Sequence, residues 1–444
     1  MIPSVRASRA CGSVRSSLQF VTKETSTGVS AARTQSLRWV PPCLSPQSRI
    51  SSPLLHSRAF HSTPKRDSHN PRISYRIAAS ATGKGRPFSP AKNAYNFNPE
   101  LHDALGVAVD TQSAVVKRKR RPDSGEDAFF VSRVGRSDSS HNSVAFAVAD
   151  GVGGWAESRV DPADFSHALC GYMAQTALDW NQPAEQLRAK ALLQAGYDQV
   201  VADDSIRAGG CTASVGIGLD DGRIELANLG DSGSVLLRQA AVHHYSIPQT
   251  HGFNTPYQLS IIPPRMRQQA SIFGGAFLED FPRDASTTTV HMHHGDVLML
   301  ATDGVFDNLN NQDILKLVTS RMLYTGAWTT STSPDTSIIS PSSRETLDKL
   351  TGPEGLSSLI PRQSDQNSKP TKKQPATAST AHETTYTLQS LIAATIAGEA
   401  KLASMDLRRD SPFAKEAQRY YPGDYYRGGK VDDIAVVIIV AVDA

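Results

Sequence analysis

The stretch from Val144 to Trp155, VAFAVADGVGGW, is the one on which the interpretation of the whole chain depends. Its first half alternates larger apolar residues with alanine, which is typical of a β-strand with close neighbours on both faces. The strand ends at Asp150, and the glycines that follow allow the backbone to approach a ligand closely. A carboxylate beside such a turn can hold a cation at the end of a sheet, but Asp-Gly is also a common hairpin dipeptide. Other acidic positions in the chain must therefore separate these two interpretations.

The composition indicates a folded protein and no particular polyanionic partner. The chain has 444 residues, of which 39% are hydrophobic and 20% charged, and its formal net charge is +3. This length suits one large domain with extensions, or roughly two or three average domains. The longest apolar run, from Ile434 to Val442, is too short to cross a bilayer, so no membrane span is expected. The four cysteines have no Cys-x-x-Cys spacing and predict neither a disulfide framework nor a thiolate zinc site.

The excess of basic residues lies at the front of the chain. Between Met1 and Arg66 the one acidic residue is Glu24, and the background is rich in Arg and Ser. Such a segment is typical of a mitochondrial presequence, and the residues around Phe60 resemble fungal mitochondrial processing sites. A basic tail with a nuclear role is the alternative. Because no apolar sorting segment follows, residues 1–66 are interpreted as a presequence that directs the protein to the mitochondrial matrix.

The composition also predicts the borders of the folded domain. Residues 67–92 are polar and without a sustained period, which predicts a disordered linker. One domain is expected over residues 93–444. Within it, residues 325–382 are dense in Ser, Thr and Pro and predict a mobile insertion.

Periodicity along residues 93–444 predicts a mixture of helices and strands. Helices are expected over 162–180, 184–201, 307–317, 385–405 and 412–420. Strands are expected over 106–116, 129–134, 144–149, 211–219, 224–229, 234–238, 287–301 (two strands) and 430–442, and those between 211 and 238 read as a meander of hairpins. The last strand is apolar on both faces, so it must lie between two layers. These features predict an α+β fold, a four-layer αββα sandwich of two antiparallel β-sheets flanked by helices.

Five acidic residues lie at the ends of predicted strands and support the metal interpretation. They are Glu126, Asp150, Asp231, Asp303 and Asp432. Each of them alone could be a turn or surface residue. Asp150, Asp303 and Asp432, however, border the most hydrophobic strands, where an unpaired carboxylate would be costly to bury. Carboxylates that gather at one end of a sandwich need cations between them, and oxygen ligands without His or Cys favour Mg²⁺ or Mn²⁺.

Strand geometry narrows this set further. Successive residues of a strand point to opposite faces of the sheet. One member of the pair Glu126 and Asp127 is therefore expected to face the metals, and the same holds for Asp432 and Asp433.

At this point six motifs, taken in order, resemble those of metal-dependent type 2C protein serine/threonine phosphatases. They are Glu-Asp at 126–127, Asp-Gly at 150–151 followed by Gly-Gly-Trp, Gly-Cys-Thr-Ala at 210–213, Gly-Asp-Ser at 230–232, Ala-Thr-Asp-Gly-Val-Phe-Asp at 301–307 and Asp-Asp-Ile at 432–434. The resemblance extends from about Asn93 to Ala444. The stretch VADGVGGW, Phe-Asn-Thr-Pro at 253–256 and Gly-Gly-Lys at 428–430 resemble the mitochondrial branch of this family in fungi.

The resemblance implies hydrolysis of phosphoserine and phosphothreonine with two bound Mg²⁺ or Mn²⁺ ions. Asp150 would bridge the ions, with the Gly151 carbonyl and Glu126 completing one site and Asp303 and Asp432 the other. Asp150, Asp303 and Asp432 would thus carry the catalysis. A hydroxide shared by the ions would attack the phosphoester in line, without a phosphoenzyme.

Four further residues take their roles from the same resemblance. Asp231, together with Asp303 and Asp307, would match a weaker site for a third ion. Asp127 would support the metal ligands from behind. Arg121 would be the phosphate-binding arginine, although Pro122 and Gly125 between it and Glu126 depart from the family pattern.

One difference from the family pattern affects how the leaving group would be protonated. Related animal enzymes carry a His after the Asp-Gly pair, proposed as the acid for the leaving group, and this chain has Val152 there. A metal-bound water or another side chain would then have to protonate the leaving group.

Three other functions compete with a matrix protein phosphatase. The first is a small-molecule phosphohydrolase with the same mechanism, and the second is an inactive regulatory or binding module with the same fold. The third is a nucleic-acid binder that uses the basic run from Lys117 to Arg121, but this run has no interleaved aromatic residues. The expected partners are phosphorylated proteins, with matrix enzymes, such as those of ubiquinone synthesis, suggested by the mitochondrial branch. No nucleic acid is expected, and the sequence makes no prediction of oligomeric state.

Overall fold

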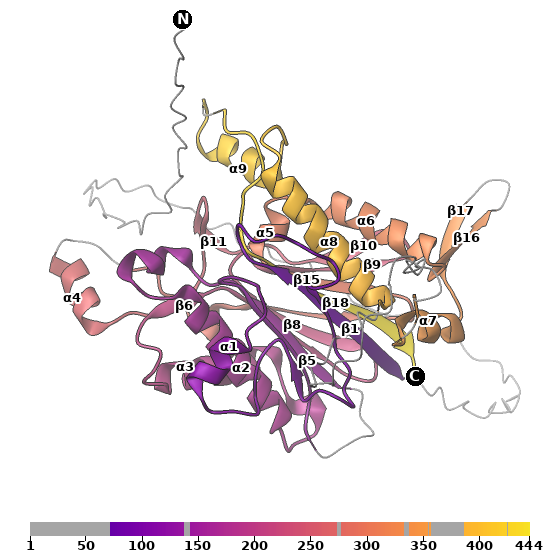
Figure 1. Cartoon of the computed structure of the whole chain (residues 1–444), viewed down its shortest axis with the longest axis horizontal. Coiled ribbons are helices and arrows are strands. Elements are labelled where there is room, and N and C mark those ends of the chain that lie inside the picture. Colours follow the sequence, from indigo (N-terminus) through magenta and orange to yellow (C-terminus); the bar gives the residue numbers. More distant parts are fainter. Residues whose placement is uncertain are drawn as a thin grey trace, which may run out of the picture.

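The computed structural model describes residues 72–136, 143–272, 277–332, 337–353, 355–356, 386–423 and 425–444. The chain forms two six-stranded sheets, and in both of them neighbouring strands are antiparallel (Figure 1). The expected presequence, residues 1–66, lies outside the described residues. No helix in the described ranges has the length and apolar character needed to cross a membrane.

The strands of each sheet come from distant parts of the chain. In spatial order the first sheet contains β10 (Ala241–Tyr245), β9 (Gly233–Arg238), β15 (Val297–Ala301), β18 (Ile434–Asp443), β1 (Ile73–Thr82) and β2 (Ala94–Asn96). The second sheet contains β14 (Ser286–His291), β8 (Arg223–Leu229), β7 (Ala213–Gly218), β5 (Val144–Ala149), β4 (Ala128–Arg133) and β3 (Ala104–Leu105). Short pairs join β13 (Leu259–Ile261) to β6 (Gly209–Cys211), β11 (Thr250–Gly252) to β12 (Thr255–Pro256) and β16 (Trp328–Thr332) to β17 (Ser337–Pro341).

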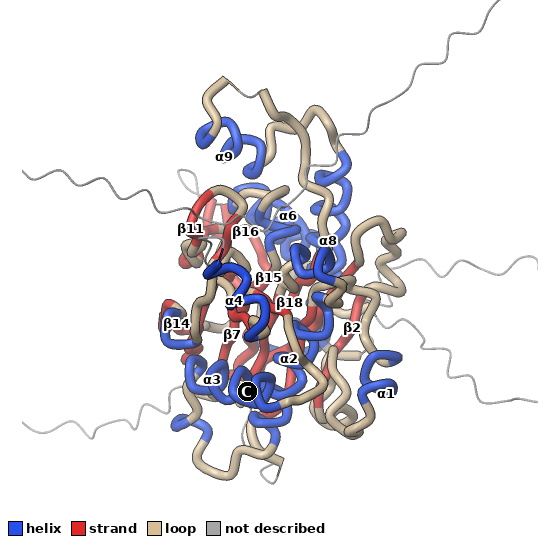
Figure 2. Tube along the Cα trace, turned by 90° about the vertical axis from the view of Figure 1, so that its left-hand side faces the viewer, coloured by secondary structure: helices blue, strands red, loops and turns tan. Residues whose placement is uncertain are grey.

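Helices cover the outer face of each sheet. The second sheet is covered by α2 (Pro162–Leu178) and α3 (Ala189–Ala202), and the first by α5 (Asp303–Phe306), α6 (Asn311–Tyr324), α7 (Arg344–Thr351) and α8 (Leu388–Met405). The remaining helices, α1 (Ala114–Lys119), α4 (Pro264–Ile272), α9 (Pro412–Tyr420), η1 (Gly153–Ser158), η2 (Ala184–Gln186) and η3 (Pro282–Asp284), lie in the connections. Figure 2 shows α9 beyond the end of α8, at the end of the molecule away from α2 and α3.

The alternation in β5 shows why these layers form. Phe146 and Val148 pack into the apolar core between the two sheets. Ala145, Ala147 and Ala149 point the other way, into the core beneath α2 and α3, where a small side chain lets the helix approach the sheet. The last strand, β18, likewise contributes residues to the inter-sheet core and to the core beneath α8. The predicted αββα sandwich is confirmed.

The predicted linker is wrong from its seventh residue onward. Residues 73–82 form β1, which pairs with β18 along its whole length and with β2 on its other side. The segment reads as a linker because Ser and Ala dilute its apolar residues, yet Ile77, Ala79 and Ala81 are buried in the inter-sheet core. The folded domain therefore begins at Ile73 and not at Asn93.

Two further predictions of local structure are wrong. Residues 106–116 do not form a strand; instead Ser113 caps the short helix α1, its side chain accepting a hydrogen bond from Val116 N. The meander between 211 and 238 is divided between the sheets, because β7 and β8 lie in the second sheet and β9 in the first. Turn residues predict where strands end, but not which sheet the next strand joins.

The predicted insertion is also partly corrected. The hairpin of β16 and β17 and the helix α7 occupy its first half. Trp328 and Leu347 are buried in the core beneath α8, which explains why this part is ordered despite its Ser and Thr content. Residues 357–382 of the predicted insertion lie outside the described residues.

Candidate metal centre

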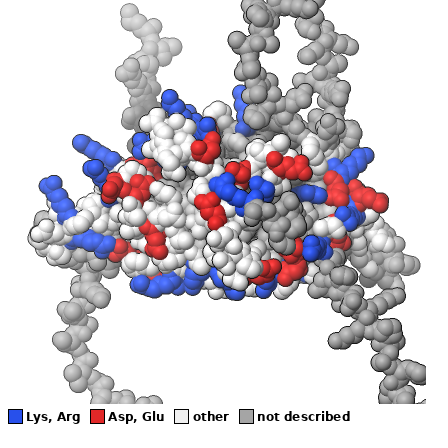
Figure 3. Space-filling view, turned by 90° about the horizontal axis from the view of Figure 1, so that it is seen from below, with Lys and Arg blue, Asp and Glu red and all other residues white. Residues whose placement is uncertain are grey.

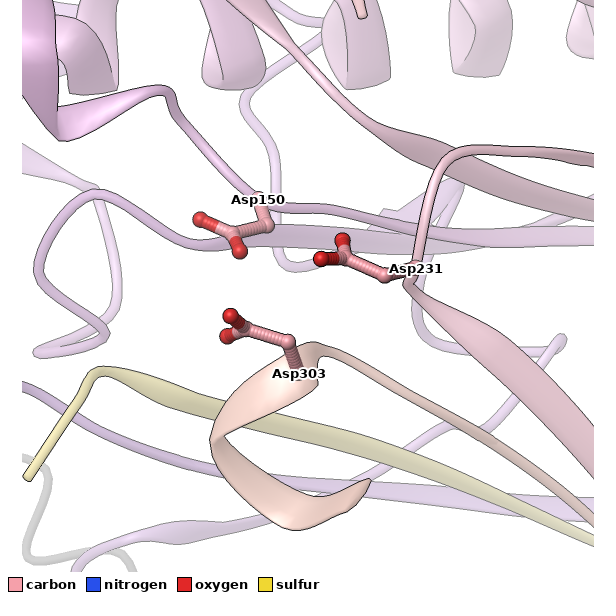
Figure 4. A group of neighbouring side chains, drawn as sticks. All are labelled: Asp150, Asp231 and Asp303. Atoms are coloured by element: carbon pink, nitrogen blue, oxygen red, sulfur yellow. The ribbon is translucent and has the colours of Figure 1, made fainter. Parts of the chain in front are cut away.

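Three of the predicted acids meet where the two sheets converge. Asp150 follows β5 and Asp231 lies between β8 and β9, while Asp303 begins α5 directly after β15. One carboxylate oxygen from each lies within 4.8 Å of the others, and Figure 4 shows the three side chains pointing toward one another. Because β5 and β15 belong to different sheets, the packing of the sheets assembles this group.

The glycine after Asp150 is required by close backbone packing. A Cβ atom at Gly151 would lie 2.7 Å from the Glu126 carbonyl oxygen and 2.9 Å from the Pro162 carbonyl oxygen. The amide of Gly151 donates a hydrogen bond to the Glu126 carbonyl at 3.2 Å. Gly151 thus brings the ends of β4 and β5 together, which holds Glu126 next to Asp150.

Two other sequence motifs hold the backbone of Asp150 from the side of β7, which pairs with β5 on the side away from β4. The amide of Thr212 donates to the Asp150 carbonyl at 2.9 Å, and the amide of Asp150 donates to Thr212 Oγ1 at 3.4 Å. Thr212 Oγ1 in turn shares a hydrogen bond of 2.7 Å with Ser232 Oγ. The motifs at 210–213 and 230–232 therefore connect the backbone of Asp150 to the turn that carries Asp231.

The pair Glu126 and Asp127 divides as strand geometry predicts. Asp127 is 1% exposed, and its Oδ2 accepts a hydrogen bond of 2.7 Å from Thr302 Oγ1, directly before Asp303. The Glu126 carboxylate points elsewhere: a Cβ at Gly153 would lie 2.9 Å from its Oε2. Burial, followed by the charges of Asp433 and Asp432, raises the pKa of Glu126 to about 7.

Asp432 and Asp433 also have separate environments. Asp433 accepts hydrogen bonds from the backbone amides of Glu126, at 2.8 Å, and Lys84. A Cβ at Gly125, whose φ is 69°, would lie 2.1 Å from Asp433 Oδ1, so only glycine fits there. Asp432 instead faces two ammonium groups, Lys430 Nζ at 3.1 Å and Lys84 Nζ at 3.6 Å. Asp433 is a backbone anchor that the sequence argument did not identify.

Lys430 is the second residue that the sequence argument missed. Its Nζ lies 2.5 Å from Asp303 Oδ2 and 2.7 Å from Asp307 Oδ2, in addition to its contact with Asp432. Burial opposes the charge on Lys430, but the carboxylates of Asp303, Asp307 and Asp432 outweigh it and raise its pKa well above the usual value. Its neighbours in the sequence, Gly428, Gly429 and Val431, give no sign of these contacts.

The electrostatics divide the acids into two groups. Burial and then the charge of Asp303 raise the pKa values of both Asp150 and Asp231 well above the usual range. Burial acts in the same direction on Asp303, but the charge and hydrogen bond of Lys430 outweigh it and lower its pKa. Asp150 and Asp231 thus lie in an environment that is short of positive charge.

The donor set fits a hard divalent cation. Among the described residues, no hydrogen-bond donor reaches the buried atoms Asp231 Oδ1 and Asp127 Oδ1. Buried carboxylate oxygens without partners are costly, and a cation with oxygen ligands would satisfy them. The residues that could hold such ions are the predicted ones, Glu126, Asp150, Gly151, Asp231, Asp303, Asp307 and Asp432.

Arg121 and Val152 have their partners outside the predicted metal ligands. The guanidinium of Arg121 contacts Asp164 Oδ1 at 2.7 Å and Asp161 Oδ2 at 3.7 Å, both at the start of α2. Its predicted role in binding phosphate stays a prediction. Val152 packs against the small apolar cluster around Trp155, as its chemistry requires, and offers no proton for a leaving group.

The basic run that includes Arg121 is engaged with acids of the same chain. Arg118 binds Asp164 and Arg120 binds Asp110. On the face shown in Figure 3, basic and acidic side chains are interspersed. Arg118, Arg120 and Arg121 of the basic run therefore each form an ion pair within the chain.

Comparisons with known proteins identify the family of the chain. The family model for "Protein phosphatase 2C" matches residues 118–333. "Protein phosphatase 2C homolog 7, mitochondrial" of Saccharomyces cerevisiae is 36% identical over 260 residues, which are 58% of this chain and 72% of that protein. "5-azacytidine resistance protein azr1" of Schizosaccharomyces pombe is 29% identical over 321 residues, 72% of this chain and 82% of that protein. The X-ray structure of the photosystem II phosphatase PBCP covers 71% of this chain and 91% of its own, with 25% identity and a TM-score of 0.45.

The chain belongs to the protein phosphatase 2C family. It is a protein phosphatase.

Proposed function

We propose that this chain is a Mg²⁺- or Mn²⁺-dependent phosphatase that removes phosphate from serine and threonine residues of mitochondrial matrix proteins. The observation that carries the proposal is the convergence of Asp150, Asp231 and Asp303 at the junction of the sheets. Membership of the phosphatase family supports the reaction class. The mitochondrial yeast relative and the Arg-rich first 66 residues support the location.

The residues of the chain bind and orient the ions. The Asp150 carboxylate lies in the close group with Asp231 and Asp303, and the Gly151 amide joins its turn to the Glu126 backbone, so Asp150 would be the ligand that two ions share. The bonds from Thr212 fix its backbone, and Asp127 with Thr302 supports the neighbouring ligand Asp303. When bound, the ions would supply the Lewis acidity that activates water and stabilises charge on a phosphoryl group.

The centre would activate water directly and would not form a phosphoenzyme. The predicted ligands are carboxylates, and no cysteine lies on the surface of the described chain: Cys170 and Cys211 are both buried. A mechanism without a phosphoenzyme, which activates water directly, needs no nucleophilic side chain. The proposed specificity for phosphoserine and phosphothreonine rests on membership of the protein phosphatase 2C family.

The test is phosphate release from a phosphothreonine peptide by the full chain with Mn²⁺, with Mg²⁺ and with chelator. We expect turnover with either metal, and loss of turnover with chelator. Asp150→Asn should lower kcat/KM by about 100-fold or more, because it removes a ligand and a buried charge at the reacting centre. Asp110→Asn, a surface acid paired with Arg120, is the matched control and should retain full activity.

Three outcomes would contradict the proposal. Turnover of nucleotide or sugar phosphates but not of phosphopeptides would favour the small-molecule phosphohydrolase. No turnover by a folded, metal-loaded protein would favour an inactive binding module.

A fusion of residues 1–66 to a fluorescent protein should accumulate in the mitochondrial matrix, and a cytosolic or nuclear signal would overturn the assigned location.

A further inference from the structure

Lys430 is held in place at both ends, which makes its ammonium a fixed part of the acidic centre. Asn308, which is fully buried, donates from Nδ2 to the Lys430 carbonyl at 2.8 Å. Its Oδ1 accepts from the Lys430 amide at 3.0 Å. The backbone of Lys430 therefore has the same two-sided hydrogen bonding that a neighbouring strand would provide.

The far end of the side chain is equally restricted. The ammonium contacts Asp303, Asp307 and Asp432, and 18% of the side chain is exposed. The ring of Phe413 lies against it, with its centroid 5.4 Å from Nζ. The amide of Phe413 also donates to the Asp307 carbonyl at 3.1 Å, so α9 is attached to the same acids.

Asp303 connects this lysine to the rest of the centre. It shares the close group with Asp150 and Asp231, and it also binds the ammonium. The ammonium binds Oδ2 of Asp303 and Oδ2 of Asp307 at short range, at 2.5 and 2.7 Å, whereas Oδ2 of Asp432 lies farther away, at 3.1 Å. A divalent ion that used Asp303 and Asp307 together would therefore need the two oxygens that the ammonium binds most closely. The fixed positive charge would also repel such an ion at short range.

We propose that the Lys430 ammonium takes the place of a divalent cation at the Asp303–Asp307 end of the centre, so that the chain binds two divalent ions and excludes a third. This inference rests on the proposed metal dependence. Two divalent ions and one ammonium neutralise most of the charge of Glu126, Asp150, Asp231, Asp303, Asp307 and Asp432. A third divalent ion would add charge where the lysine has already supplied it.

The experiment counts the Mn²⁺ ions bound by the full chain, by equilibrium dialysis with elemental analysis and by calorimetric titration. We expect two ions for wild type and for Lys430→Arg, which keeps the charge. Lys430→Met should bind three, because it frees two carboxylates and removes the repelling charge. The double variant Lys430→Met with Asp307→Asn should return to two.

A second measurement keeps the proposal testable if Lys430→Met does not fold. In the wild-type background, Asp307→Asn should leave the number of bound ions unchanged at two, since Asp307 serves the lysine. Three ions in wild type, or the same number in wild type and in folded Lys430→Met, would overturn the inference. Wild type without any bound ion would instead overturn the proposed metal dependence, so the two failures are distinguishable.

Discussion

The imidazole of His167 lies on the inner side of α2, behind the strand end that carries Glu126 and Asp127. It is 8% exposed. Burial, and after it the charge of Arg121, lowers its pKa to about 3, against the opposing effects of Asp164 and a hydrogen bond with the Asp127 backbone. The folded protein therefore keeps His167 neutral, whereas the unfolded chain protonates it near the ordinary value of about 6.5. A pKa that is lower in the folded state contributes stability above pH 6.5, and this stability is lost as the pH falls toward 3.

The resulting prediction concerns the free energy of unfolding between pH 7.5 and pH 5.5. Between these two pH values His167 should lower the free energy of unfolding by about 1.4 kcal/mol. The reason is that the unfolded chain takes up roughly one proton at His167 over the pH unit below its unfolded pKa, whereas the folded protein takes up none. In His167→Gln this decrease in the free energy of unfolding should be absent. Urea denaturation of both proteins at the two pH values measures the difference, and equal pH dependence in the two would show that the folded protein can protonate His167.

At the scale of one element, β1 matters most for the integrity of the sheet. It lies between β18 and β2, with register pairs from Ile73 with Asp443 to Thr82 with Ile434. Without it, the edge of β18 would expose unpaired backbone groups along the most apolar strand of the chain. The connection after β1 also carries Lys84, whose amide binds Asp433, so the strand supports the metal centre indirectly.

We therefore predict opposite results for two truncated chains. A chain that begins at Asp67 should be soluble and fold cooperatively, because it retains β1. A chain that begins at Asn93, the border that composition predicts, should be insoluble or lack a cooperative thermal transition. Circular dichroism and thermal melting distinguish the two, and a stable, active chain from Asn93 would mean that β1 is dispensable.

At the scale of the whole molecule, the core between the sheets includes a large and a small residue that face each other on neighbouring strands of one sheet. Phe146 of β5 is fully buried between the sheets. Its register partner on β7 is Gly216, where a Cβ would lie 2.2 Å from the Phe146 ring. The glycine thus leaves, beside β5, the space that the ring fills on the face of this sheet that packs against the other sheet.

Gly216→Ala should therefore destabilise the protein by about 1 to 3 kcal/mol, the usual cost of overpacking a core. The smaller side chain of Phe146→Leu should relieve the collision. We expect the double variant to lose less stability than the two single variants combined, with a coupling energy of about 0.5 kcal/mol or more. Denaturant unfolding of the four proteins measures this coupling, and strict additivity would contradict the role assigned to the pair.

Much of this protein could be predicted from local patterns in its sequence. Alternation in Val144–Ala149 and the doubly apolar run of β18 were sufficient to predict stacked sheets, because side-chain direction in a strand depends only on sequence parity. The acidic residues at strand ends predicted an acidic centre because unpaired carboxylates are costly to bury there, and three of them, Asp150, Asp231 and Asp303, form a close group. The capped helix at Pro162 and the helix up to Met405 were also predictable, since their signals lie within the element.

Only the tertiary structure decided the features that depend on contacts between distant residues. β1 has a weak pattern of its own and is a strand because β18, more than 350 positions later, pairs with it. Lys430 reads as one more surface charge until folding brings Asp303, Asp307 and Asn308 around it, from more than 120 positions earlier. Sequence patterns report the periodicity of one segment, whereas the partner of a strand or of a buried charge is set by packing across the whole chain.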